Sequence, residues 1–166
     1  MSAEVNADYE IYSIVFVCQG NICRSPMALA AFRRFAIQYV WSDNVAADSA
    51  GTSRWHVGQE MDPRARKELQ RRGYIVAPHL ARRVSEADRN AMLMIALDVT
   101  TADRLRSRGF SPERIHLMST YDSTPKNSPS IDDPYPGTQA DFARVMDRLE
   151  QIIPEFCVSI EASLRP

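Results

Sequence analysis

The amino-acid sequence predicts an α/β domain with helices on both faces of a parallel sheet. Short apolar segments typical of buried strands alternate with helical segments along all 166 residues. Strands that are joined by helices pair in parallel through right-handed crossovers, and this buries both faces of the sheet. No internal repeat or linker divides the chain. Its length suits one compact domain, which we expect over residues 13–166, after a loose arm formed by residues 1–12.

The first strand is predicted over residues 13–18, a β-branched apolar run that lacks the polar alternation of a half-exposed strand. A turn follows at Gln19-Gly20-Asn21. Ser25 and Pro26 then predict a helix start, with the serine as N-cap and the proline at the first helical position. Apolar residues continue this helix at helical spacing, namely Leu29, Phe32, Phe35, Ala36, Tyr39 and Val40.

The same alternation predicts the later elements. Strands are expected over residues 45–50, 92–97 and 114–119, and helices over residues 62–72 and 101–108. A loop rich in Ser, Pro, Asp and Gly spans about residues 121–137. The last helix carries apolar residues from Phe142 to Ile153, and Pro154 is expected to kink it.

The charge balance excludes one broad class of function. The chain has 20 basic and 21 acidic residues and a net charge of −1, so a chain-wide electrostatic attraction to nucleic acid or to an anionic membrane is not expected. Any anion must therefore be bound at a local site. No apolar run is long enough to span a membrane, and the start of the chain lacks the pattern of a signal peptide. We expect a cytoplasmic protein whose three cysteines are reduced.

One segment combines several features of a phosphate site. After the first strand the chain reads Cys18-Gln19-Gly20-Asn21-Ile22-Cys23-Arg24-Ser25. A loop that closes onto a helix N-terminus points several backbone N–H groups into one concavity. Arg24 can add a bidentate contact to two phosphate oxygens, and the same positive field favours the thiolate of Cys18. The hydroxyl of Ser25 can donate a hydrogen bond to that sulfur.

Other interpretations of this segment fit less well. A Walker loop needs Gly-Lys-Ser/Thr, and a redox pair needs Cys-x-x-Cys. A zinc site built from Cys18, Cys23 and histidines lacks a second matching pair downstream. We therefore expect neither a metal nor a cofactor.

The sequence resembles the low-molecular-weight protein tyrosine phosphatases from about Ile14 to Phe156. The strongest match is Val17 to Ala28, with further matches at Asp48-Ser49-Ala50-Gly51-Thr52, Trp55-His56-Val57-Gly58, Asp62-Pro63-Arg64-Ala65 and Asp133-Pro134-Tyr135. The resemblance implies a four-stranded parallel sheet and metal-free hydrolysis of phosphotyrosine through a phosphocysteine intermediate.

The resemblance also implies a role for each site residue. Cys18 is the expected nucleophile, Arg24 binds the phosphate, and Asp133 is the general acid and later the base. Asp132 is expected to be an ordinary loop carboxylate. The phosphate-binding loop comprises Gln19, Gly20, Asn21, Ile22, Cys23, Arg24 and Ser25.

Other residues match the surroundings of the family's site. Trp55, His56 and Tyr135 correspond to contacts of the substrate ring. Cys23 matches a loop cysteine that can form a disulfide with Cys18 under oxidation. A last group is expected to brace the loop through hydrogen bonds: Asn21, Ser25, Ser49 and His79.

Three alternatives remain open. An arsenate reductase of the same fold needs relay cysteines, but no cysteine lies between Cys23 and Cys157. A protein arginine phosphatase favours a smaller, hydroxyl-bearing residue at the Ile22 position. The third alternative is an inactive module that only binds phosphotyrosine. The sequence gives no reason for such a loss of activity, because Cys18, Arg24, Ser25 and Asp133 are all present. The expected partner is a tyrosine-phosphorylated protein, with no nucleic acid, and the enzyme is expected to be a monomer or to self-associate weakly.

Overall fold

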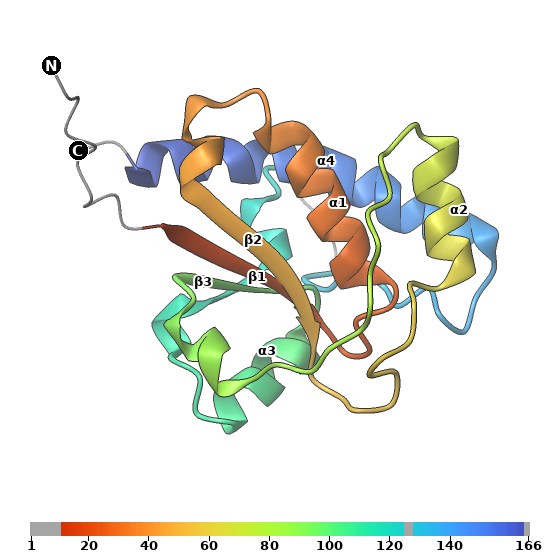
Figure 1. Ribbon diagram of the computed structural model, residues 1–166, viewed down its shortest axis with the longest axis horizontal. Helices are drawn as coiled ribbons and strands as arrows, with labels where there is room; N and C mark the ends of the chain where they lie inside the picture. The colour runs from red at the N-terminus through yellow and green to blue at the C-terminus, as the bar shows by residue number, and fades with distance from the viewer. Residues whose placement is uncertain (1–10, 125–127, 165–166) are drawn as a thin grey trace, which may run out of the picture.

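A computed structural model describes residues 11–124 and 128–164 of the chain (Figure 1). Its sheet has four parallel strands in the order β2-β1-β3-β4. The predicted fold class is therefore confirmed. A loose arm was predicted over residues 1–12. Residues 1–10 of it lie outside the described residues, and Tyr12 already belongs to the first strand. The strands are β1 (Tyr12–Cys18), β2 (Val45–Gly51), β3 (Leu93–Ala96) and β4 (Ile115–Leu117).

Helices and short 3-10 turns connect the strands. The helices are α1 (Arg24–Ala36), α2 (Pro63–Arg71), α3 (Val99–Ser107) and α4 (Gln139–Leu164). The 3-10 turns are η1 (Val40–Asn44), η2 (Glu86–Asn90), η3 (Pro112–Arg114) and η4 (Met118–Tyr121). In the described part of the chain, no helix is long and apolar enough to cross a membrane.

The side chains of β1 alternate between two hydrophobic clusters. Ile14 and Phe16 face the cluster built with α1 and α4, whereas Val15 and Val17 face the smaller cluster that includes residues of α3. Figure 1 shows this division, with α1 and α4 on one side of the sheet and α3 on the other. Both faces of β1 are buried, which explains its uninterrupted apolar sequence.

The start and the end of α1 differ from the prediction. Ser25 is not the N-cap: Cys23 occupies that position, with no side-chain cap, and Ser25 lies inside the first turn. The hydroxyl of Ser25 bonds to groups of the preceding loop instead, so tertiary contacts override its capping preference. The helix ends at Ala36, before Tyr39 and Val40, and Val40 is exposed at the start of η1.

Two of the later helices, α2 and α3, begin after an aspartate. Asp62 accepts a hydrogen bond from the backbone N–H of Arg64 (2.8 Å) and caps α2, and a left-handed Gly73 follows that helix (φ 76°). Asp98 accepts from the N–H of Thr101 (2.6 Å) and starts α3 earlier than predicted. The last helix continues through Pro154 to Leu164.

The topology places one edge of the sheet where a ligand site is expected. The chain passes from β1 outward to β2 and then returns past β1 to β3. Ligands of open α/β sheets bind beyond the carboxyl ends of the strands at such a reversal. Cys18 ends β1 and Asp98 follows β3, so both residues lie at this edge.

Candidate active site

The segment between β1 and α1 folds back over the carboxyl end of the sheet. Within it, Asn21 has a left-handed backbone (φ 57°), a conformation that Asn tolerates better than most residues. Its backbone N–H points at the sulfur of Cys18, with an N-to-Sγ distance of 3.3 Å. The residues after β2 bind the same segment. The backbone N–H of Thr52 donates to the carbonyl of Cys18 (3.0 Å), and that of Ser53 donates to the carbonyl of Gln19 (2.9 Å).

The side chain of Asn21 is fully buried and holds this loop from inside. Its amide nitrogen donates to the hydroxyls of Ser25 and Ser49, each at 2.9 Å, and its oxygen accepts from the backbone N–H of Arg82 at 2.9 Å. The carbonyl of Asn21 lies 2.6 Å from Nε2 of His79. All four residues expected to brace the loop therefore belong to one hydrogen-bond network.

Ser25 has one proton to donate and two candidate acceptors. Its oxygen lies 3.0 Å from the sulfur of Cys18 and 3.4 Å from the carbonyl of Ala50. Asn21 donates to that oxygen, and in the bond between Ser25 and Cys18 either the hydroxyl or the thiol can be the donor. The hydroxyl of Ser25 and the N–H of Asn21 thus both contact a buried sulfur.

Arg24 is buried at the start of α1, with a relative exposure of 3%. Its Nη1 donates to Oδ2 of Asp98 (2.5 Å) and to the carbonyl of Ile131 (2.9 Å). Its Nε is buried and has no hydrogen-bond partner among the described residues, and its Nη2 lies 3.8 Å from Oδ2 of Asp133. Nη1 is therefore anchored, whereas Nε has no hydrogen-bond partner among the described residues and Nη2 has a longer contact with a carboxylate.

A cavity of about 150 Å³ opens above these groups. Asp133 lies on its wall with a half-exposed side chain, whereas the neighbouring Asp132 is exposed and does not line it. The lining contains the predicted catalytic residues and ring contacts together: Cys18, Gln19, Gly20, Ile22, Cys23, Arg24, Trp55, His56, Asp133 and Tyr135.

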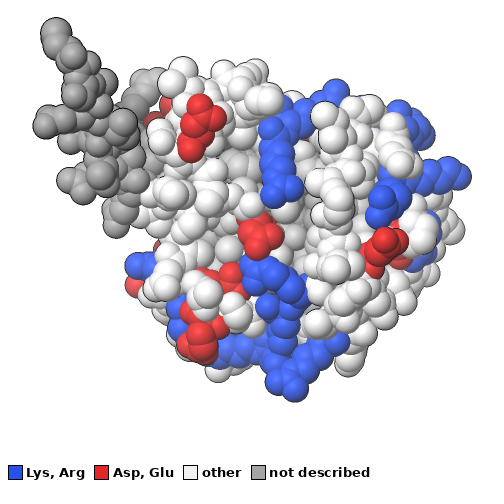
Figure 2. Space-filling model, in the orientation of Figure 1, with Lys and Arg blue, Asp and Glu red and all other residues white. Residues whose placement is uncertain are grey.

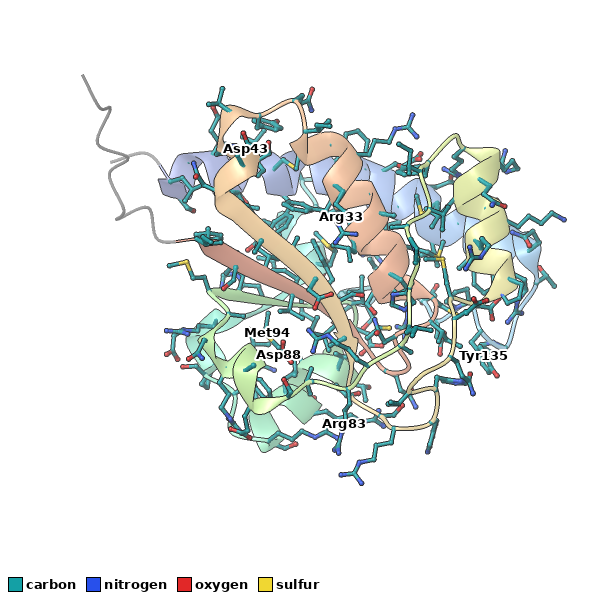
Figure 3. The ribbon with its side chains drawn as sticks, in the orientation of Figure 1. Arg33, Asp43, Arg83, Asp88, Met94 and Tyr135 are labelled. Carbon is teal, nitrogen blue, oxygen red and sulfur yellow. The ribbon has the colours of Figure 1, made fainter. Side chains whose placement is uncertain are left out.

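Aromatic side chains form the rim of this cavity. His56 and Tyr135 contact each other with ring centroids 5.5 Å apart, and Trp55 is 74% exposed. Tyr135 projects from the loop before α4 toward the end of the molecule where α2 begins (Figure 3). A Cβ at Gly20 would approach the ring of His56 to 2.8 Å, so the absence of a side chain there admits the imidazole.

A comparison with protein families matches residues 13–165 to the model described as "Low molecular weight phosphotyrosine protein phosphatase". The chain belongs to this phosphatase family. "Low molecular weight protein-tyrosine phosphatase A" of Mycobacterium tuberculosis is 37% identical over 142 residues, which cover 85% of this chain and 86% of the relative. The human "Low molecular weight phosphotyrosine protein phosphatase" is 33% identical over 144 residues, covering 84% and 89%.

Solved structures agree with this assignment. A protein tyrosine phosphatase from Entamoeba histolytica, crystallised with Hepes in its active site, matches with a TM-score of 0.85 and 33% identity, covering 91% of this chain and 97% of that one. The present protein is therefore a protein tyrosine phosphatase, that is, a hydrolase that acts on phosphoproteins.

The phosphatase site also contains residues that sequence analysis did not assign. Asp98 anchors Arg24, and Arg82 holds Asn21 through its backbone. Arg64 donates to the carbonyls of Tyr135 and Gly137, both at 3.0 Å, and so ties the loop of Asp133 to α2. The one signal for Asp98 was an N-cap aspartate directly after a buried strand, at the edge where ligands bind.

The charges in this phosphatase site perturb one another. Burial raises the pKa of Asp98, but the charge of Arg24 and hydrogen bonds from Thr101 outweigh it, so the carboxyl stays ionised. Burial, and then the charge of Asp62, raise the pKa of the Cys23 thiol well above its usual range. Cys23 is therefore a neutral thiol at physiological pH.

A larger cavity of about 640 Å³ lies elsewhere, between α1 and residues 73–80. Of the predicted site residues, only His79 lines it. The smaller cavity, by contrast, brings together Cys18, Arg24 and Asp133, the three residues that the sequence analysis expects to carry the chemistry. Within the described ranges, no three His, Cys, Asp or Glu side chains are grouped so that they could hold a metal ion.

Proposed function

We propose that this phosphatase hydrolyses phosphotyrosine by transferring the phosphoryl group to the sulfur of Cys18. The observation that carries the proposal is one small cavity lined by a buried thiol, by aromatic residues and by an arginine whose Nε has no hydrogen-bond partner among the described residues. In the first step the S–P bond forms and the P–O bond to the phenol breaks. In the second step water attacks phosphorus and the S–P bond breaks, which releases phosphate.

Cys18 is the proposed nucleophile because two hydrogen-bonding groups meet at its buried sulfur. The N–H of Asn21 donates to the sulfur, and the hydroxyl of Ser25 can donate to it while the sulfur reacts. The same donors lower the energy of the departing thiolate in the second step. Since the Asn21 network already fixes both donors, little reorganisation accompanies the reaction.

Arg24 is proposed to bind two phosphate oxygens through Nε and Nη2. Its Nη1 is held by Asp98 and by the carbonyl of Ile131, so the guanidinium plane is oriented before substrate arrives. The buried Nε lacks any partner among the described residues, and an unsatisfied buried donor favours a bound acceptor. A planar fork matches the equatorial oxygens of the transferring group.

Asp133 is proposed as the acid that protonates the phenolate oxygen and as the base that then takes a proton from water. Its Oδ1 accepts from the N–H of Tyr135 (3.1 Å), which leaves Oδ2 on the side of Arg24. The proton must be present in the first step and absent in the second, so the pH–rate profile should be bell-shaped.

The cavity walls favour an aryl phosphate. Trp55, His56 and Tyr135 flank the opening, and the apolar Ile22 lines it from the loop. A phenyl ring can contact these groups while its phosphate reaches Cys18. We propose them as the contacts of the substrate ring.

Oxidation of the site is proposed to be reversible. A peroxide converts Cys18 to a sulfenic acid, and the thiol of Cys23 then displaces water to form a disulfide. Both cysteines are free, buried and line the same cavity. Because catalysis requires the free thiol of Cys18, we also propose that the enzyme works in a reducing compartment, the cytoplasm.

The test compares Asp133→Asn with Asp132→Asn over aryl phosphates whose phenols differ in acidity. Asp133→Asn should lower kcat/KM by ~10²–10⁴ on phosphotyrosine, and less on substrates with good leaving groups, because a stable phenolate leaves unaided. Asp132→Asn is the matched control and should stay within a few-fold of wild type. An equal fractional loss along the whole series for Asp133→Asn would remove the acid role from this residue.

A further inference from the structure

Four arginines that take no part in the site described above lie on segments that start or end at the carboxyl edge of the sheet. Arg54 directly precedes the rim residue Trp55. Arg83 forms an isolated parallel bridge with Gly51, the last residue of β2. Arg104 lies on α3, and Arg108 is its C-cap. We call Arg54, Arg83, Arg104 and Arg108 the arginine strip.

The four side chains lie close enough for the charges of the other three to act on Arg108. In Figure 2, Lys and Arg side chains run from the middle of the displayed face to its lower edge, where Figure 1 has the loop after β2 and α3. Figure 3 labels Arg83 in this region, between that loop and α3. Burial lowers the pKa of Arg108, and the charges of Arg83, Arg104 and Arg54 lower it further, so these guanidinium groups repel one another.

The strip has no counter-charge within the described part of the chain. None of its four side chains makes an ion pair there, and Nε of Arg83 and Nη1 of Arg108 are buried without a hydrogen-bond partner. The nearby carboxylates are already engaged: Asp88 pairs with Arg82, Glu86 with Arg89 and Asp103 with Arg106. Unpaired, mutually repelling cations are stabilised by a nearby anion.

We propose that the arginine strip is a substrate-recognition surface, which binds acidic side chains of the polypeptide that carries the phosphotyrosine. This inference rests on the proposed function, which supplies a polypeptide at the cavity mouth. The nine residues of α3 span about 13 Å, which corresponds to about four residues of extended peptide. A peptide anchored by its phosphotyrosine can therefore reach the strip with the residues next to it.

The strip selects among substrates and has no part in bond breaking. Its side chains are not among those that line the catalytic cavity. A small aryl phosphate fills only that cavity, so it cannot report on the strip. The preference must instead appear as a difference in kcat/KM between peptides, and it must weaken as salt screens the charges.

The experiment compares pairs of phosphotyrosine peptides. Within a pair, one peptide has glutamates beside the phosphotyrosine and the other has glutamines at the same positions. One pair carries these residues before the phosphotyrosine, and a second pair carries them after it. For the wild-type enzyme, kcat/KM should favour the glutamate peptide by about tenfold at low ionic strength in at least one pair. In the double variant Arg83→Gln/Arg104→Gln this ratio should fall to within about twofold of unity. Arg104→Glu should disfavour the glutamate peptide.

The matched control is Arg33→Gln/Lys67→Gln, on the exposed surfaces of α1 and α2. Both double variants change the net charge from −1 to −3, since each removes two positive charges. The control should keep the wild-type ratio. Equal rates for both peptides with the wild-type enzyme, or an unchanged ratio in the strip variant, would overturn the proposal while leaving phosphotyrosine hydrolysis intact. Hydrolysis of neither peptide would overturn the proposed function together with the strip.

Discussion

Arg24 and Asp98 lie 74 positions apart in the chain, and a hydrogen bond of 2.5 Å joins Nη1 of the arginine to Oδ2 of the aspartate. The contact links the start of α1 to the start of α3 across the carboxyl edge of the sheet. It also decides which edge of the guanidinium remains free. The orientation of Arg24 therefore depends on a residue outside the phosphate-binding loop.

Asp98→Asn should lower kcat/KM about tenfold to a hundredfold on aryl phosphates, because the guanidinium loses its charged anchor and its preferred orientation. The pKa of Asp98 is lowered, so its stabilising charge is present at neutral pH and is lost as the pH falls through that lowered value. The variant should thus be less stable than wild type at neutral pH, and the difference should shrink in acid. Steady-state kinetics and thermal unfolding measure both effects.

Asp103→Asn is the control for this prediction. Asp103 lies on the same helix, but it is exposed, and among the described residues its ion pair is with Arg106. Its loss should change kcat/KM and stability little. Equal effects of the two substitutions would mean that the charge of Asp98 does not orient Arg24.

Arg24→Lys should be nearly inactive although it keeps the positive charge. An ammonium is a point charge and cannot contact two phosphate oxygens in one plane. Loss of ~3 kcal/mol of transition-state stabilisation corresponds to a rate about a hundredfold lower. Steady-state kinetics on p-nitrophenyl phosphate measure this loss. A kcat/KM of the variant within fivefold of the wild-type value would mean that Arg24 contributes charge alone.

Glu68→Gln should destabilise the fold in a pH-dependent manner. Hydrogen bonds from Arg71 and then Arg72 lower the pKa of the buried Glu68 to about 2, against the effect of burial. Its ionised form therefore stabilises the protein at pH values above about 4.5, and this contribution is lost as the pH falls toward 2. At neutral pH we expect a loss of about 2–3 kcal/mol in the free energy of unfolding.

Denaturant unfolding at several pH values measures this difference. The exposed Glu60 provides the matched control, and Glu60→Gln should be nearly neutral throughout. A deficit of Glu68→Gln that stays constant down to pH 2.5 would contradict the assignment of the ion pair.

The sequence predicted the parts of the site that are contiguous or follow a strong local rule. The loop from Cys18 to Ser25 carries its chemistry in one segment, and buried strands were recognisable from their apolar runs. Asp133 and Tyr135 came from the family resemblance, since an Asp-Pro-Tyr loop has no pattern of its own. Their arrangement around one cavity follows from the fold.

Long-range partners could not be predicted in this way. Asp98 looks like an ordinary helix cap until the structure brings Arg24 beside it. Ser25 was assigned as an N-cap because its preference is local, whereas its actual partners, Asn21 and Cys18, depend on how the loop closes. The arginine strip draws residues from three separate segments, so no local charge pattern marks it.

The most direct test of the proposed mechanism is to trap the phosphorylated sulfur. Asp133→Asn removes the base of the second step, while p-nitrophenyl phosphate leaves without an acid in the first, so the phosphoenzyme should accumulate. Acid quenching and mass spectrometry of the peptide that holds Cys18 and Cys23 should find one added phosphoryl group, and fragmentation should assign it to Cys18. Cys18→Ala in the same background should carry none. A phosphoryl group on another residue, or hydrolysis that persists in Cys18→Ala, would contradict the mechanism.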